Sequence, residues 1–136
     1  ARRARRRAGA RPAEPATERG ASLSSERLQA VLAAEREKFI RPDIAPIFAG
    51  WNKTMEYHFG DLDQTYRLRF VDGLAQPPER VEGRPPPAAI RYEMDSWVLA
   101  ALASGELTGK KAYFKRLLRV KAPFGDMMKL QSLNGK

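Results

Sequence analysis

The chain has 136 residues, as expected for one domain, and a net charge of +9 from 25 Lys and Arg against 16 Asp and Glu. It contains no cysteine, so disulfides, thiolate metal sites and cysteine nucleophiles are all excluded. Its longest fully apolar run, Trp97 to Ala103, has seven residues, far fewer than the roughly 20 that a membrane-spanning helix needs.

The excess positive charge gathers at the N-terminus. Residues 1–20 hold seven Arg and two Glu, a net of +5, whereas residues 21–136 hold 18 basic and 14 acidic residues, a net of +4. Residues 1–22 have no aromatic or large aliphatic side chain to offset the entropy of folding. We therefore predict a disordered tail or linker there and a folded domain over 23–136.

Three other uses of the arginine-rich tail stay open. It could grip anionic lipid, bind nucleic acid, or be the remnant of an organelle-targeting segment. No apolar run follows it, as one would in a secretory signal, so we expect a cytoplasmic protein.

The first predicted element is a helix that starts at Ser24 or Ser25, either of which can cap it. Pro42 ends this helix, and Asp43 is predicted to cap a second, short helix that runs through Phe48. The apolar stripe of the first helix consists of Leu28, Val31, Leu32, Phe39 and one charged member, Glu35.

The pattern then changes to period two, which predicts a hairpin with one apolar face and one polar face. A turn over 60–63 separates its strands, and Asp72-Gly73 marks the next turn. A loop is predicted over 76–87 with a short edge strand at 79–82, followed by a strand over 89–94. The apolar face of the hairpin consists of Met55, Tyr57, Phe59, Tyr66, Leu68 and Phe70.

The last third of the chain predicts a helix over 96–104, capped by Asp95 or Ser96 and ended by Gly105. Thr108 is predicted to cap another helix through Tyr113. A strand over 114–122 and a final helix from Phe124 to about Leu133 complete the chain. The order of elements indicates an α+β fold with helices against a mixed or antiparallel sheet.

Enzyme motifs are weak. Gly105 and Gly109 imitate a phosphate-binding loop, but Lys111 stands where that loop needs a magnesium-binding hydroxyl. The one histidine, His58, has no nucleophile motif beside it. We expect no catalysis, no cofactor and no metal.

A basic stretch with two aromatics follows Gly109. It suits single-stranded nucleic acid, but an edge strand also carries Lys and Arg to prevent aggregation, and the RNA-binding aromatic signature is absent. We therefore do not expect the folded part to bind nucleic acid. The stretch consists of Lys110, Lys111, Tyr113, Phe114, Lys115, Arg116, Arg119 and Lys121.

The last third of the chain carries one recognisable series of positions: Asp95, Trp97, Gly105, Leu107, Ala112, Phe114, Leu118, Val120 and the run Met128-Lys129-Leu130-Gln131. Through these positions, residues 95–133 resemble the C-terminal half of the sterol carrier protein 2 (SCP2) sterol-binding family. The likeness extends more loosely over about 25–134. The family often has Gly where this chain has Arg116. In place of the Gly that follows the last strand in the family, this chain has Ala122-Pro123. The tripeptide that addresses some members to peroxisomes is not at the C-terminus, so we do not expect that location.

The resemblance implies a sheet of about five strands, covered by helices, with an apolar tunnel between them. Members bind sterols, fatty acids, fatty acyl-CoA or phospholipids without catalysis, so it implies lipid binding and lipid transport. Such a site is lined by apolar and Met side chains. The expected lining is Met55, Phe70, Trp97, Leu102, Leu107, Phe124, Met127, Met128 and Leu130, with Gln131 as a polar anchor.

Two further expectations concern partners. Lys110, Lys111, Lys115 and Arg119 would touch anionic membrane transiently or hold the phosphates of an acyl-CoA. The alternative is an accessory or interaction domain of a longer protein, with the same fold and no lipid cargo.

Overall fold

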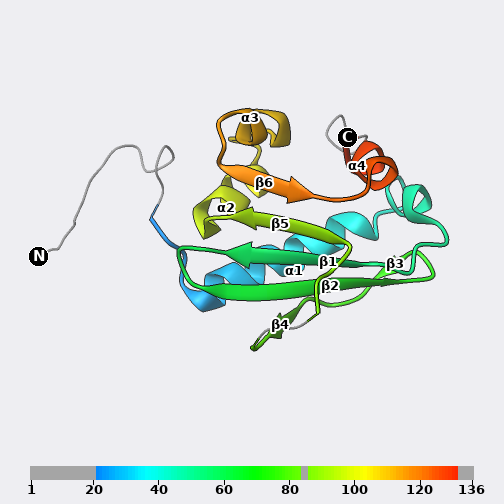
Figure 1. The fold of residues 1–136 in the computed structure, drawn as a ribbon, viewed down its shortest axis with the longest axis horizontal. Helices are drawn as coiled ribbons and strands as arrows, with labels where there is room; N and C mark the ends of the chain where they lie inside the picture. The colour runs from blue at the N-terminus through cyan, green and yellow to red at the C-terminus, as the bar shows by residue number, and fades with distance from the viewer. Residues whose placement is uncertain (1–20, 84–85, 132–136) are drawn as a thin grey trace, which may run out of the picture.

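The computed structural model describes residues 21–83 and 86–131, and Gln131 by its backbone alone. The predicted tail therefore lies outside the described residues except for Ala21 and Ser22, as do Leu133 and the rest of the C-terminus. The described part is a mixed sheet with helix α1 (Ser25–Phe39) across one face and helices α3 (Gly109–Phe114) and α4 (Phe124–Gln131) near one edge (Figure 1).

Helix α1 forms as its sequence predicts. The Ser24 hydroxyl accepts a hydrogen bond from the Arg27 N–H, and Leu28, Leu32 and Phe39 are buried. The short helix that follows is a 3-10 helix, η1 (Ala45–Phe48). The prediction that Asp43 caps this helix is wrong. Ile44 holds the cap position without a side-chain hydrogen bond, and Asp43 pairs with Arg41 instead, at 2.7 Å.

Strands β1 (Thr54–Phe59) and β2 (Gln64–Val71) form the predicted antiparallel hairpin. Two short strands, β3 (Leu74–Ala75) and β4 (Glu79–Val81), also pair antiparallel with β2. Strand β4 confirms the predicted edge strand, whereas the two residues of β3 are too few to form a visible period.

Strand β5 (Ile90–Met94) pairs parallel with β1, and β6 (Leu118–Lys121) pairs antiparallel with β5. The described sheet therefore has six strands, in the order β3-β2-β1-β5-β6 with β4 also on β2, rather than about five. Its mixed character and the α+β class are as predicted.

Helix α2 (Ser96–Ser104) ends at Gly105, whose φ of 86° is left-handed as a helix exit requires. Asp95 precedes the helix, but its side chain makes no capping hydrogen bond. Asp61, from the β1–β2 turn, accepts from both the N–H and the hydroxyl of Ser96, at 2.9 and 2.6 Å. The cap thus comes from a segment 35 residues away, which local sequence could not indicate.

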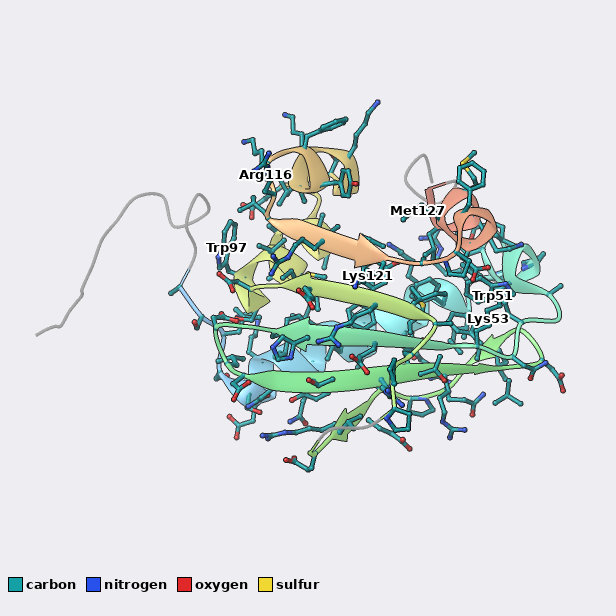
Figure 2. The ribbon with its side chains drawn as sticks, viewed as in Figure 1. Trp51, Lys53, Trp97, Arg116, Lys121 and Met127 are labelled. Carbon is teal, nitrogen blue, oxygen red and sulfur yellow. The ribbon has the colours of Figure 1, made fainter. Side chains whose placement is uncertain are left out.

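The strand predicted over 114–122 is shorter, covering only Leu118–Lys121. Helix α3 continues through Phe114, and Arg116 then takes a left-handed φ of 63° at the turn into β6 (Figure 2). Glycine takes this conformation without steric cost, and the sequence resemblance places glycine at this position.

An aromatic cluster anchors the end of the sheet near η1. Phe48 lies with ring centroids 5.4 Å from Phe39, 4.8 Å from Trp51 and 5.1 Å from Phe70. Gly73 passes so close that a Cβ there would lie 2.8 Å from the Phe48 carbonyl oxygen. The tight turn therefore needs glycine for space as well as for its φ of 86°.

The sheet face opposite these aromatics is polar. Glu56 is buried between Arg67, at 2.8 Å, and Arg91, at 3.2 Å. The Pro86 carbonyl accepts a further hydrogen bond from Arg67. The predicted division into one apolar and one polar face is confirmed, and it leaves the helix-covered face as the place for an apolar site.

Candidate ligand-binding cavity

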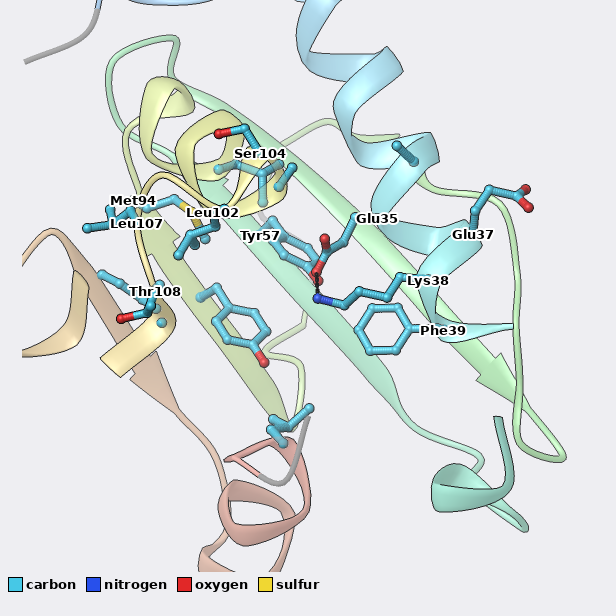
Figure 3. Close-up of a pocket in the computed structure, with 18 of the residues that line it drawn as sticks. Glu35, Glu37, Lys38, Phe39, Tyr57, Met94, Leu102, Ser104, Leu107 and Thr108 are labelled. Atoms are coloured by element: carbon cyan, nitrogen blue, oxygen red, sulfur yellow. Dashed lines mark ion pairs between the residues drawn. The ribbon is translucent and has the colours of Figure 1, made fainter. Parts of the chain in front are cut away.

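A cavity of about 790 Å³ lies between α1 and the helix-covered face of the sheet (Figure 3). This volume is within the roughly 300–1,000 Å³ of small-molecule sites. Strands β1, β5 and β6 supply its floor, α1 and the α2–α3 segment its sides, and α4 contributes Leu130. Its apolar lining consists of Ala34, Phe39, Ile44, Met94, Leu99, Leu102, Ala103, Leu107, Leu118 and Leu130.

The floor follows from strand alternation. Tyr57 on β1 is paired in register with Tyr92 on the parallel strand β5, so both rings lie on the same face. Their ring centroids are 5.0 Å apart with planes inclined by 24°. Met94 and Leu118, which are paired in register across the antiparallel strands β5 and β6, extend this floor.

A polar corner interrupts the apolar lining. It consists of Glu35 and Lys38 on α1 with the hydroxyls of Tyr57 and Tyr92, and this set is called the polar corner below. The Lys38 ammonium is 3.6 Å from the Glu35 carboxylate, across one helical turn. The Glu35 side chain is only 17% exposed, compared with 42% for Lys38. The carboxylate is therefore the more enclosed charge, and Figure 3 shows it directed toward Tyr57.

The two tyrosines respond to this environment. Burial raises the pKa of Tyr57 well above its usual value, and the negative charge of Glu35 raises it further. The same two causes, in the same order, raise the pKa of Tyr92. Neither hydroxyl has a hydrogen-bond partner among the residues that the structure describes. Neither is among the fully enclosed side-chain polar atoms that lack a partner in the described residues, so both hydroxyls keep contact with solvent in the cavity and are available to a ligand.

The cavity opens to solvent between α1 and the α2–α3 segment. Exposed residues flank the opening: Ala34, Glu37 and Arg41 on one side and Ser104 and Thr108 on the other. Thr108 also caps α3 by accepting from the Lys111 N–H at 3.1 Å. The mouth is thus next to the start of α3.

Three of the ten residues predicted to line a tunnel border this cavity: Leu102, Leu107 and Leu130. Met55 and Phe70 are buried in the core beside it. Trp97 on α2 and Met127 on α4 are partly buried and lie far apart, at opposite ends of the molecule (Figure 2).

The remaining predicted lining residues lie elsewhere. Phe124 is 80% exposed and Met128 is 51% exposed, so the structure places both at the surface of α4 instead of in the cavity wall. Helix α4 turns Asp126 and Leu130 inward, and Phe124 and Met128 fall on its other side. The Gln131 side chain lies outside the described residues.

Sequence reasoning missed the polar corner as a site. Its available signal was Glu35, the one charged member of an otherwise apolar helical stripe. A charge in that position needs a partner or a polar ligand beside it.

The predicted basic residues gather on a second surface, called the α3 surface below. Lys110, Lys111 and Lys115 are exposed there, together with Tyr113 and Phe114, the latter 71% exposed. Arg119 on β6 is exposed as well, but it pairs with Glu93 at 3.1 Å.

Nowhere in 21–83 and 86–131 do three His, Cys, Asp or Glu side chains come together as metal ligands would. Within the same ranges, every helix is too short or too polar to cross a membrane.

No protein-family model and no curated protein matches the sequence of the chain. Solved structures show its fold. A crystal structure of sterol carrier protein 2 superposes with a TM-score of 0.56 at 14% identity, covering 76% of this chain and 84% of that one. The palmitated sterol carrier protein 2 like 2 of Aedes aegypti gives 0.57 at 10% identity, with 84% and 96% covered. The fold is therefore that of sterol carrier protein 2.

A larger enzyme contains the same fold. The stereoselective inverting sec-alkylsulfatase from Pseudomonas sp. gives a TM-score of 0.58 at 18% identity over 86% of this chain. The match spans only 16% of the alkylsulfatase.

Proposed function

We propose that the chain binds one lipid or other long apolar molecule, non-catalytically, in the cavity between α1 and the sheet. The observation that carries the proposal is the cavity of about 790 Å³ with apolar walls and an open mouth. Small-molecule sites are concave, have volumes of roughly 300–1,000 Å³ and are lined mainly by apolar side chains with a few polar groups, and the site between α1 and the sheet has these properties.

The binding strength follows from the apolar contact. Burying about ten methylenes at roughly 0.8 kcal/mol each contributes about 8 kcal/mol. Association entropy offsets several kcal/mol of this. We therefore expect micromolar or weaker affinity, which suits a protein that takes up and releases its ligand in the cytoplasm.

Binding without catalysis is supported by where the reactive side chains lie. His58 is on the polar sheet face, where its Nδ1 is 2.9 Å from the Thr65 hydroxyl. The cavity itself offers Glu35, Lys38 and two tyrosines whose pKa values are raised, which makes their hydroxyls poor nucleophiles.

Transfer of the ligand would require contact with a membrane, and the α3 surface is suited to it. Aromatic side chains prefer the membrane interface. Each lysine near an anionic membrane surface contributes about 1 kcal/mol to binding. Tyr113 and Phe114 are exposed among Lys110, Lys111 and Lys115. Since α3 begins beside the cavity mouth, docking through this surface would bring the mouth toward the lipid.

Native mass spectrometry of the protein purified from cells tests the proposal. A retained lipid would appear as a discrete added mass that organic solvent removes. A saturable increase in Nile red fluorescence, with one site per chain, is the matching result for the delipidated protein. A protein that carries no added mass and gives no saturable signal with Nile red would contradict the proposal.

The second candidate is an accessory domain without cargo. The alkylsulfatase match favours it, because there the same fold is a small part of a larger enzyme. The Nile red titration separates the two candidates, since only the first requires an accessible apolar site.

A further inference from the structure

We infer that the polar corner selects the ligand by its head: Glu35, Tyr57 and Tyr92 favour a lipid with an uncharged hydroxyl head over one that ends in a carboxylate. This inference rests on the proposed function and adds the chemical class of the ligand.

The hydroxyls of Tyr57 and Tyr92 can bind the head of a ligand. Tyr57 is 3% exposed and lines the cavity, yet its hydroxyl has no hydrogen-bond partner in the described part of the chain, and neither has that of Tyr92. Both hydroxyl oxygens keep contact with solvent in the open cavity, since neither is among the fully enclosed side-chain polar atoms of the described residues that lack a partner. A ligand that fills the cavity displaces this solvent, and a hydroxyl then left without a partner costs roughly 1–3 kcal/mol. A ligand that brings a hydrogen-bonding head to this corner avoids that cost, whereas an entirely apolar ligand incurs it.

Glu35 adds a carboxylate to the two hydroxyls of the polar corner. An ionised carboxylate only accepts hydrogen bonds, whereas a phenol both donates and accepts. A ligand hydroxyl placed between them donates its proton to Glu35 and accepts from Tyr57 or Tyr92. It thereby satisfies both kinds of group with a single oxygen atom.

The negative charge of Glu35 disfavours a ligand with a carboxylate head. It would be a second anion beside Glu35, the more enclosed member of its ion pair. Lys38 does not reverse this balance, because its charge is already paired with Glu35 and is closer to solvent. The negative charge of Glu35 is also felt at both tyrosines, where it adds to the rise in pKa. The same field would disfavour an ionised ligand head at that place.

The remaining walls then accommodate the chain of the ligand. Met94, Leu102, Leu107 and Leu118 line the cavity with no charged group of their own. A single alkyl chain with a hydroxyl end fits a polar corner beside an apolar inner lining, and the other polar residues of the cavity, Glu37, Arg41, Ser104 and Thr108, lie at its mouth.

The test compares 1-dodecanol with dodecanoate, which differ only in the head group, as competitors of the uncharged probe Nile red near neutral pH. The wild-type protein should bind dodecanol at least about tenfold more tightly. An alcohol also enters any apolar site more readily than an anion does, so the deciding quantity is how a substitution changes this ratio.

Glu35→Gln removes the negative charge and leaves Lys38 and both hydroxyls for an anion. It should raise dodecanoate affinity about tenfold or more and bring the ratio toward or below one. Glu26→Gln, at an exposed position in the first turn of the same helix and outside the cavity lining, should leave the ratio unchanged. The double variant Tyr57→Phe/Tyr92→Phe should weaken dodecanol without weakening Nile red.

The outcomes separate the two proposals. If Nile red and both competitors bind but Glu35→Gln leaves the ratio as in the wild type, the inference about the head group is wrong and lipid binding stands. The same holds if dodecanoate binds the wild type as tightly as dodecanol. If none of the three binds, the proposed function fails, and the inference fails with it.

Discussion

Lys53 and Asp126 join the first residues of the sheet to the last helix: the Lys53 ammonium is 2.7 Å from both carboxylate oxygens of Asp126. The Asp126 carboxylate is buried, whereas the ammonium is partly exposed and lies 5.3 Å from the centroid of the Trp51 ring. Since Leu130 on the same helix borders the cavity, this ion pair holds one wall of the site in place.

Asp126→Ala should therefore lower the free energy of unfolding by about 1–2 kcal/mol. Breaking a fully buried pair costs about 3–5 kcal/mol, but Lys53 can turn toward water, which reduces the cost. Urea denaturation measures the change. Glu82→Ala, which removes the exposed pair with Arg80, is the control and should cost less than about 0.5 kcal/mol. Equal losses in both variants would show that the Lys53–Asp126 pair is no more than a surface contact.

Ala34→Trp should block the cavity mouth. Ala34 is exposed on α1 and borders the cavity, so a large ring there would occupy the opening at little cost to the fold. We expect Nile red affinity to fall at least about tenfold. Ala33→Trp is the matched control, because Ala33 is equally exposed but does not border the cavity. A weaker signal in both variants, or in neither, would place the probe elsewhere.

Stability should fall as the pH rises above about 10. Tyr57 and Tyr92 have raised pKa values in the folded protein, compared with a usual value of 10.0. Above that pH the unfolded chain loses both protons while the folded chain keeps them, so the folded state is penalised by up to about 1.4 kcal/mol per pH unit for each tyrosine. The charged side chains that line the same cavity are Glu35, Glu37, Lys38 and Arg41, and Glu35 contributes to the raised pKa of both tyrosines.

Denaturation of the wild type and of Tyr57→Phe/Tyr92→Phe between neutral and alkaline pH checks this. The double variant should lose less stability over the alkaline range, whatever its stability at neutral pH. Tyr113→Phe, at an exposed position, should follow the wild type. Parallel curves for all three proteins would contradict burial of the two hydroxyls.

Lys110→Glu/Lys111→Glu should weaken binding to vesicles that contain phosphatidylserine by more than about tenfold, because each lysine near an anionic surface contributes about 1 kcal/mol. Arg27→Glu/Arg69→Glu makes the same change in net charge at exposed positions away from α3. Co-sedimentation of the two variants separates a local surface from overall charge. If both variants lose binding equally, the α3 surface has no special part in docking.

Much of the fold could be predicted because its signals are local. Alternation of side chains gave β1 and β2, and the hydroxyls of Ser24 and Thr108 cap their helices as predicted. The left-handed turn at Arg116 has no such signal, because a positive φ is uncommon for residues other than glycine and arginine does not indicate one. The predicted strand there was consequently too long.

The candidate site was harder to predict from the sequence, because segments far apart in the chain form it. Tyr57 and Tyr92 meet only through the parallel pairing of β1 with β5, which no local pattern specifies. An apolar residue type also does not say whether it lies in a core, a cavity or at the surface. Phe70, Leu102 and Phe124, all predicted to line the site, occupy these three environments in turn.

The most direct measurement is by nuclear magnetic resonance, with methyl-labelled protein and unlabelled dodecanol. If the cavity holds the ligand, nuclear Overhauser effects will connect the alkyl chain with the methyl groups of Leu102, Leu107 and Leu118, and Met128 on the surface of α4 will show none. Contacts confined to Met128, or no contacts with the cavity leucines at saturating ligand, would contradict binding inside the fold.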